Sequence, residues 1–135
     1  MVYRLGHFVF YIIGKLFYRL KILGLENVPK EGGALIFGNH SSYFDPPLVG
    51  TCIPRDIFYI GRDTLFRNPV AAFILRAVHV IPMNRGIGFR GGFEKALQSI
   101  GMGRVILAFP EGTRSLDGEM QRGKPGLGML ISQAK

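Results

Sequence analysis

The chain has 135 residues, the length of one domain, and 47% of them are apolar, which excludes an intrinsically disordered chain. Its 19 glycines and 8 prolines predict many tight turns and disfavour an all-helical bundle. The net charge of +8 favours anionic partners such as nucleic acid, acidic lipid headgroups or phosphorylated substrates. The single cysteine, Cys52, excludes an internal disulfide, and we expect it to be a small buried residue.

Residues 1–22 predict an amphipathic helix. Large apolar side chains recur at helical spacing, at Leu5, Phe8, Val9, Ile12, Leu16, Phe17 and Leu20. Basic and tyrosine side chains fall on another face, at Tyr11, Lys15, Tyr18 and Arg19. Such a helix suits a membrane interface, and we expect His7 within it to be an interface residue. Packing of this helix on the protein core is the alternative. A membrane-spanning helix is disfavoured because the longest apolar run is residues 8–13.

Residues 23–135 predict an α/β domain, because short apolar runs alternate with segments of helical length. Strands are expected at residues 34–38 (buried), 57–60, 79–82 and 104–109, the last of them central. Helices are expected at residues 69–78, 89–100 and from 125 onward, with Asn68 capping the first and Gly101 closing the second. We therefore expect a mixed, largely parallel central sheet flanked by helices.

The most informative stretch is residues 38–47, Gly-Asn-His-Ser-Ser-Tyr-Phe-Asp-Pro-Pro. A strand that ends just before it places His40 at the carboxyl edge of the sheet, where open α/β sheets bind their ligands. Four residues separate His40 from Asp45, and on a turn into a helix this spacing can bring the carboxylate back to the imidazole. An Asp that accepts from one ring nitrogen leaves the other free to take a proton. The alternative is structural, with His40 bonded to the backbone and Asp45 capping a helix.

Two further loops follow predicted strands. Residues 109–115, Phe-Pro-Glu-Gly-Thr-Arg-Ser, contain Arg114, whose planar guanidinium suits a phosphate. Residues 81–86 place Arg85 at another strand end. A base and two arginines at neighbouring strand ends predict a pocket that holds an anion beside the base. A solvated loop with a weak Glu111–Arg114 surface pair is the alternative.

Together these blocks resemble the glycerolipid acyltransferase family of the 1-acylglycerol-3-phosphate acyltransferases, also called lysophosphatidic acid acyltransferases or PlsC. That family is marked, in order, by NHxxxxD, I-P-x-x-R and FPEGTRS. This chain has the three blocks at residues 39–45, 81–85 and 109–115, and the resemblance covers about residues 20–135. The family's fourth block, an apolar V-P-I-V-P-V-like strand, is absent, so we expect residues 23–135 to be the N-terminal part of the domain.

The resemblance implies that His40 is the catalytic base and Asp45 its partner. It implies that the acceptor's phosphate is bound by Arg85, Glu111, Gly112, Thr113 and Arg114, and we add Asn39, Ser41 and Lys124 as supporting residues. The acyl donor would be a thioester of coenzyme A or acyl carrier protein, with no metal and no cofactor. Main-chain N–H groups near Ser41 or near the Gly112 turn are candidates to bind the oxyanion.

The implied reaction is O-acylation of the free hydroxyl of 1-acylglycerol-3-phosphate, which gives phosphatidic acid in phospholipid biosynthesis. We expect a lysophospholipid acceptor and a peripheral, monotopic enzyme on the cytoplasmic face of a membrane. One alternative is another acceptor, such as glycerol-3-phosphate, a lyso-ornithine lipid or another lysophospholipid. A different class is a non-catalytic basic lipid-binding module. No RNP, zinc-finger or KH signature is present, so we expect no nucleic-acid partner.

Overall fold

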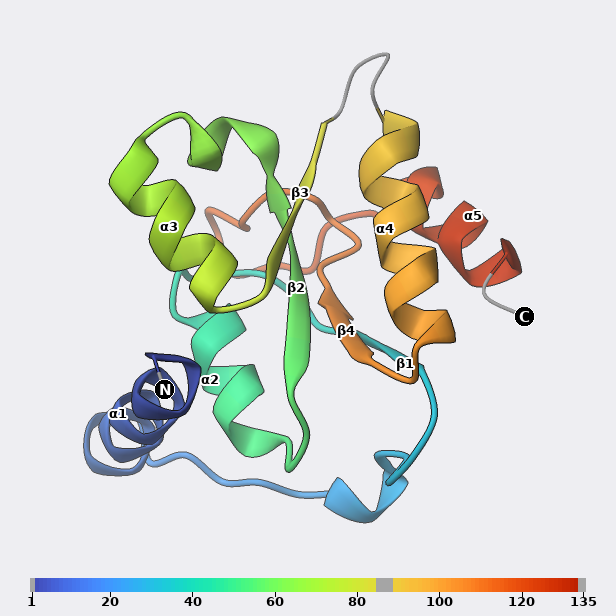
Figure 1. Cartoon of the computed structure of the whole chain (residues 1–135). Coiled ribbons are helices and arrows are strands. Elements are labelled where there is room, and N and C mark those ends of the chain that lie inside the picture. The colour runs from blue at the N-terminus through green and yellow to red at the C-terminus, as the bar shows by residue number, and fades with distance from the viewer. Residues whose placement is uncertain (1, 85–88, 134–135) are drawn as a thin grey trace.

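The computed structural model describes residues 2–84 and 89–133 and has a four-stranded sheet between two helical layers (Figure 1). The strands are β1 (Ala34–Phe37), β2 (Ile57–Arg62), β3 (Val80–Met83) and β4 (Val105–Ala108). The helices are α1 (Val2–Phe17), α2 (Asp45–Cys52), α3 (Pro69–Ala77), α4 (Phe89–Gly101) and α5 (Pro125–Gln133), with 3-10 turns at Leu25–Asn27 and Asp63–Phe66. The expected α/β class and the order of the expected strands and helices are confirmed. Helix α2 was expected only as a helix that the His40 loop enters, without bounds, and the 3-10 turns were not expected.

The sheet order is β1-β4-β2-β3, and each described pair of neighbouring strands is parallel. The expectation of a mixed sheet is therefore not met among the described strands. Right-handed crossovers explain the layers: α2 and α3 connect strands that step one way across the sheet, and α4 connects the step back. Figure 1 accordingly shows α1, α2 and α3 on one side of the sheet and α4 and α5 on the other.

Strand β4 is the centre of the core, as its apolar sequence predicts. Val105, Ile106 and Leu107 are fully buried, because β4 pairs on both edges and is covered on both faces. Alternate residues of β4 face opposite sides of the sheet. Val105 and Leu107 pack on the side of α1, and Ile106 packs on the side of α4. Strand β1 was expected to be buried, but it is half-buried because it lies at the end of the described strand order.

Helix α1 contacts the rest of the protein through a face other than its predicted apolar stripe. Tyr3 is buried, and its Oη accepts a hydrogen bond of 2.8 Å from the Ile57 N–H. The Tyr3 ring lies 4.1 Å from the His7 ring and 4.6 Å from the His79 ring. His7 therefore faces the protein, which corrects the expectation that it is an interface residue. Burial lowers the pKa of His7, which favours the neutral imidazole against these rings.

The alternative that α1 packs on the core is confirmed for the face that carries Tyr3, while the predicted apolar stripe is exposed. Its exposed helical members are Leu5, Phe8, Val9, Ile12, Leu16 and Phe17, while Leu20 follows the helix. Within residues 2–84 and 89–133, no helix combines the length and the hydropathy that a bilayer crossing requires.

The helix ends follow the sequence signals with one difference. Asn68 caps α3 as predicted, because its Oδ1 accepts from the Val70 and Ala71 N–H groups at 2.9 and 3.1 Å. Helix α4 includes Gly101 as its last residue, whereas Gly101 was expected to follow the helix. The left-handed residue after α4 is Gly103, with a φ of 78°, because the chain must turn there into β4.

Candidate active site

His40 and Asp45 are in contact at the carboxyl end of β1. The His40 Nδ1 lies 3.0 Å from the Asp45 Oδ2, and the two side chains are 17% and 20% exposed. Strand β1 delivers His40 to the sheet edge, and Asp45 is the first residue of α2. The contact expected from their spacing is confirmed, and the pair is partly shielded while a substrate can still approach it.

The Asp45 carboxylate also fixes the backbone of its own loop. Its Oδ2 accepts hydrogen bonds of 2.7 Å from both the Ser41 and the Ser42 N–H groups. A carboxylate oxygen that accepts from two N–H groups is an acceptor for the imidazole as well, so Nδ1 is the protonated nitrogen of His40. The His40 Nε2 is then free to accept a proton.

The loop after β4 lies against the His40 loop because β4 is the neighbour of β1. The Phe109 ring stacks on the His40 imidazole, with ring centroids 4.2 Å apart and an interplanar angle of 23°. The Ser115 N–H donates to the His40 carbonyl oxygen at 2.7 Å. The imidazole therefore has Asp45 at one edge and an aromatic ring on one face, which restricts its orientation.

Glu111 is directed at the His40 backbone rather than at an open site. It is 3% exposed, and its Oε1 accepts from the His40 N–H at 3.0 Å. Within the described part of the chain its Oε2 is buried without a hydrogen-bond partner. Because a buried carboxylate also repels a phosphate, this geometry favours a positioning role over the predicted phosphate contact.

The turn at Gly112 joins this loop to β2. Gly112 has a φ of 64°, which glycine adopts without strain, and its N–H donates to the Phe109 carbonyl oxygen at 3.0 Å. The Arg62 guanidinium, at the end of β2, donates to the Gly112 carbonyl oxygen at 3.2 Å. Thr113 follows in a half-buried position. The ends of β1, β4 and β2 thus meet at one edge.

Arg114 lies on Tyr43, a residue of the His40 loop. Its Cζ is 3.5 Å from the centroid of the Tyr43 ring, and its Nη2 donates to the Tyr43 Oη at 2.9 Å. The guanidinium has further N–H donors that can bind an anion. Arg114 therefore sits beside the His40 loop, as a phosphate clamp requires.

The remaining predicted site residues are less informative. Asn39 is exposed next to His40. Lys124 is also exposed, and its N–H donates to the Pro110 carbonyl oxygen at 2.8 Å, which keeps the start of α5 beside the loop after β4. The prediction for Arg85 lies outside the described residues.

Several residues of the site were not predicted to belong to it. Tyr43 and Phe109 lie within the two motifs without a role that the motifs predict, and Arg62 lies outside them. Asp117 orders the end of the second loop: hydrogen bonds from the Ser115 hydroxyl and the Glu119 N–H hold its pKa below the usual value. Aromatic residues inside or beside a motif were the available signal for Tyr43 and Phe109.

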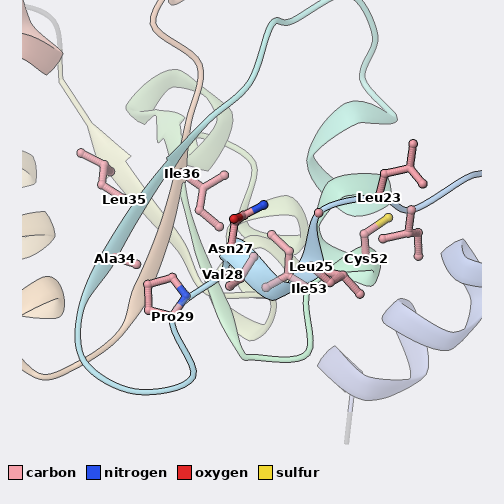
Figure 2. Close-up of a pocket in the computed structure, with 12 residues that line it drawn as sticks. Leu23, Leu25, Asn27, Val28, Pro29, Ala34, Leu35, Ile36, Cys52 and Ile53 are labelled. Carbon is pink, nitrogen blue, oxygen red and sulfur yellow. The ribbon is translucent and has the colours of Figure 1, made fainter.

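The structure also has an apolar hollow of about 460 Å³, whose lining residues are drawn in Figure 2. It is lined by Ile22, Leu23, Gly24, Leu25, Asn27, Val28, Pro29, Ala34, Leu35, Ile36, Cys52 and Ile53. Cys52 is half-buried at its wall rather than enclosed in the core, and burial raises the pKa of its thiol. His40 is not part of this lining.

Comparisons with known proteins agree with the motifs. A family model described as Acyltransferase matches residues 19–135. A 1-acyl-sn-glycerol-3-phosphate acyltransferase of Borreliella burgdorferi is 32% identical over 110 residues, which cover 80% of this chain and 44% of that protein. One of Bacillus subtilis is 29% identical over 106 residues, covering 77% of this chain and 53% of the relative.

The fold comparison points the same way. The crystal structure of the 1-acyl-sn-glycerophosphate (LPA) acyltransferase PlsC from Thermotoga maritima aligns with a TM-score of 0.66 and 25% identity, covering 95% of this chain and 55% of that one. The chain thus spans about half the length of these relatives. The family match over most of the sequence, with the parallel α/β fold, shows that this chain belongs to the Acyltransferase family of PlsC-like enzymes.

Proposed function

We propose that this chain carries the catalytic base and an acceptor-binding arginine of an enzyme that acylates 1-acylglycerol-3-phosphate to phosphatidic acid. The observation that carries the proposal is the 3.0 Å contact between the His40 Nδ1 and the Asp45 Oδ2, which leaves the Nε2 as the proton acceptor. Relatives named 1-acyl-sn-glycerol-3-phosphate acyltransferases support this acceptor over others.

In the proposed reaction the His40 Nε2 removes the proton of the acceptor's free hydroxyl as its oxygen attacks the thioester carbonyl. A tetrahedral intermediate forms, the C–S bond breaks, and the imidazolium returns the proton to the departing thiolate. Asp45 stabilises the imidazolium through its hydrogen bond to Nδ1. A positioned base of this kind contributes about 10² to 10⁴ in rate.

The oxyanion needs donors other than the two N–H groups that Asp45 holds. The N–H groups of Ser41 and Ser42 both donate to the Asp45 Oδ2 in this structure, which disfavours the first of the two predicted donor regions. We therefore assign the oxyanion to the loop after β4, where Thr113 and Arg114 follow the Gly112 turn. Arg114 also binds the acceptor's phosphate and so places the hydroxyl near His40.

We also propose that α1 lies in the membrane interface through its exposed apolar stripe. Exposed basic side chains accompany that stripe at Arg4, Lys15 and Arg19. They suit the anionic cytoplasmic leaflet, and they place a lipid acceptor close to the enzyme.

The proposal is tested by transfer of a radiolabelled acyl group from acyl-coenzyme A or acyl carrier protein to a panel of acceptors. The panel contains lysophosphatidic acid, glycerol-3-phosphate, a lyso-ornithine lipid and lysophosphatidylcholine. We expect labelled phosphatidic acid as the main product, and none above background with His40→Ala. A greater kcat/KM with another acceptor would replace the substrate assignment, and full activity of His40→Ala would remove the mechanism.

A further inference from the structure

The crossover helices α3 and α4 expose different kinds of side chain. Helix α4 buries Phe93 and Ala96 and turns Glu94, Lys95 and Gln98 to solvent, as expected of an amphipathic surface helix. Helix α3 buries Ala72 and leaves large apolar side chains outside. Val70, Phe73 and Ile74 are 66%, 71% and 51% exposed.

The exposed residues of α3 form one stripe. Val70, Phe73 and Ile74 are spaced i, i+3 and i+4, so they lie on the same face of the helix. Leu65, in the 3-10 turn before α3, is also exposed. Apolar residues scattered over a surface are ordinary, but a contiguous stripe marks an interaction site.

The charges around the stripe indicate what it binds. Residues 64–84 contain Arg67 and Arg76 and no Asp or Glu. Both arginines are exposed, and the Arg76 Cζ lies 5.8 Å from the centroid of the Phe66 ring. Residues 2–22, which include α1, likewise contain basic residues and no acidic ones. Apart from Asp63, at the start of the 3-10 turn before α3, the charged residues beside these apolar side chains are basic, which matches an anionic bilayer surface.

The position of α3 agrees with this partner. Helices α1 and α3 lie on the same side of the sheet (Figure 1), and Tyr3 of α1 and Val78, directly after α3, pack in the same core cluster. We infer that α3 is a second membrane-contact helix, which binds an anionic bilayer through Val70, Phe73 and Ile74 with Arg67 and Arg76 at its flanks.

A protein bound to the bilayer through α1 alone can rotate about that helix. A second contact through α3 restricts this rotation. The amino terminus of α3 follows the carboxyl end of β2, where Arg62 bonds to the Gly112 turn. The first turn of α3, which carries Val70, therefore lies near the edge of the sheet that holds His40.

The chain contains no tryptophan, so a single introduced Trp reports on one position. We compare Phe73→Trp with Phe8→Trp, on the exposed stripe of α1, and with Met102→Trp, which follows α4 and is 58% exposed. Vesicles of phosphatidylcholine with phosphatidylglycerol are added, and the acyl chains of a second set are brominated. We expect Phe73→Trp to shift to shorter emission wavelength and to be quenched by the brominated lipid, while Met102→Trp changes in neither respect.

A binding measurement supplies the second readout. The double variant Phe73→Ser with Ile74→Ser should bind these vesicles roughly tenfold more weakly, from the apolar area removed, whereas Met102→Ser should bind as the parent does. Circular dichroism checks that both remain folded, which we expect because the altered side chains are exposed.

Three outcomes overturn the inference. A shift in Phe8→Trp without one in Phe73→Trp leaves α1 as the contact. A blue-shifted Phe73→Trp before vesicles are added shows that a second copy or another part of the protein covers α3. If the emission of neither variant shifts, neither α1 nor α3 contacts the membrane. This result would leave the proposed reaction untouched, because acyl transfer is measured separately in detergent.

Discussion

The two loops that form the site, residues 38–44 and 109–124, differ in where their hydrogen bonds come from. In the first, Asp45 accepts from the Ser41 and Ser42 N–H groups and from His40, so residues close in sequence determine the geometry. The second loop has turns of its own, but Glu111 and Ser115 bond to His40, and the Gly112 carbonyl oxygen accepts from Arg62.

The difference indicates that the first loop carries the reacting imidazole of His40. The second loop positions this imidazole and binds the substrate. Changes at His40 and at its partner Asp45 should therefore act mainly on turnover, whereas Tyr43 of the first loop should act on acceptor binding through Arg114. Changes in the second should separate into effects on turnover, through Glu111, and effects on acceptor binding, through Arg114. The predictions that follow test this division, from the largest expected effect to the smallest.

Replacement of the base should have the largest effect. We expect His40→Ala to lower kcat by about 10² to 10⁴, because no positioned group then accepts the hydroxyl proton. Lipid binding, measured by equilibrium sedimentation with vesicles, should remain. His79→Ala is the matched control for loss of a histidine away from the site. If the kcat of His40→Ala lies within severalfold of the parent value, another group must accept the proton.

The partner of the base should come next. Asp45→Asn keeps the size of the side chain but removes the charge that stabilises the imidazolium, and we expect kcat to fall by about 10². The acceptor KM should change little. The same variant weakens the bonds to the Ser41 and Ser42 N–H groups, so its midpoint of urea unfolding should also fall. An unchanged kcat would leave Asp45 as a residue that only orders its own loop.

Glu111 distinguishes positioning from phosphate binding. We expect Glu111→Ala to lower kcat about tenfold, because the partly buried His40 N–H loses its acceptor and the imidazole shifts. Glu111→Gln should recover most of this activity, since its amide oxygen can accept the same bond. A rise in the acceptor KM with kcat unchanged would instead support the predicted phosphate contact.

Arg114 should act on the acceptor. We expect Arg114→Ala to raise the KM for lysophosphatidic acid about tenfold, as loss of a charged hydrogen bond implies, with a smaller effect on the acyl donor. Arg114→Lys keeps the charge without the planar fork, so its acceptor KM should lie between those of the parent and of Arg114→Ala. Initial rates over a range of acceptor concentrations provide the test, and an unchanged KM would exclude the clamp.

Tyr43 should have the smallest effect. Its ring supports the Arg114 guanidinium, and a cation–π contact at an exposed site is worth about 0.5 to 1 kcal/mol. We expect Tyr43→Phe to raise the acceptor KM about twofold, because only the hydrogen bond to Oη is lost, and Tyr43→Ala to raise it further. In the Arg114→Ala background the Tyr43→Ala change should have no effect. Additive effects would show that the two residues act separately.

The parts of the fold and site that depend on local pattern were predicted well. The order of strands and helices, the Asn68 cap and the contact between His40 and Asp45 follow from residues that are close in sequence. The pattern did not predict which face of α1 contacts the rest of the protein. The α1 stripe is exposed while Tyr3 and His7 face the protein, because Tyr3 bonds to the backbone of β2, far along the chain.

The sequence by itself determined the α/β class, the family and the residues of the catalytic loop, because hydrophobic period, caps and short motifs are local properties. Only the tertiary structure decided that Glu111 faces the His40 backbone, that Phe109 stacks on the imidazole and that Arg114 lies on Tyr43. These contacts depend on β4 entering the sheet between β1 and β2, which brings loops separated by about 70 residues of sequence to one edge.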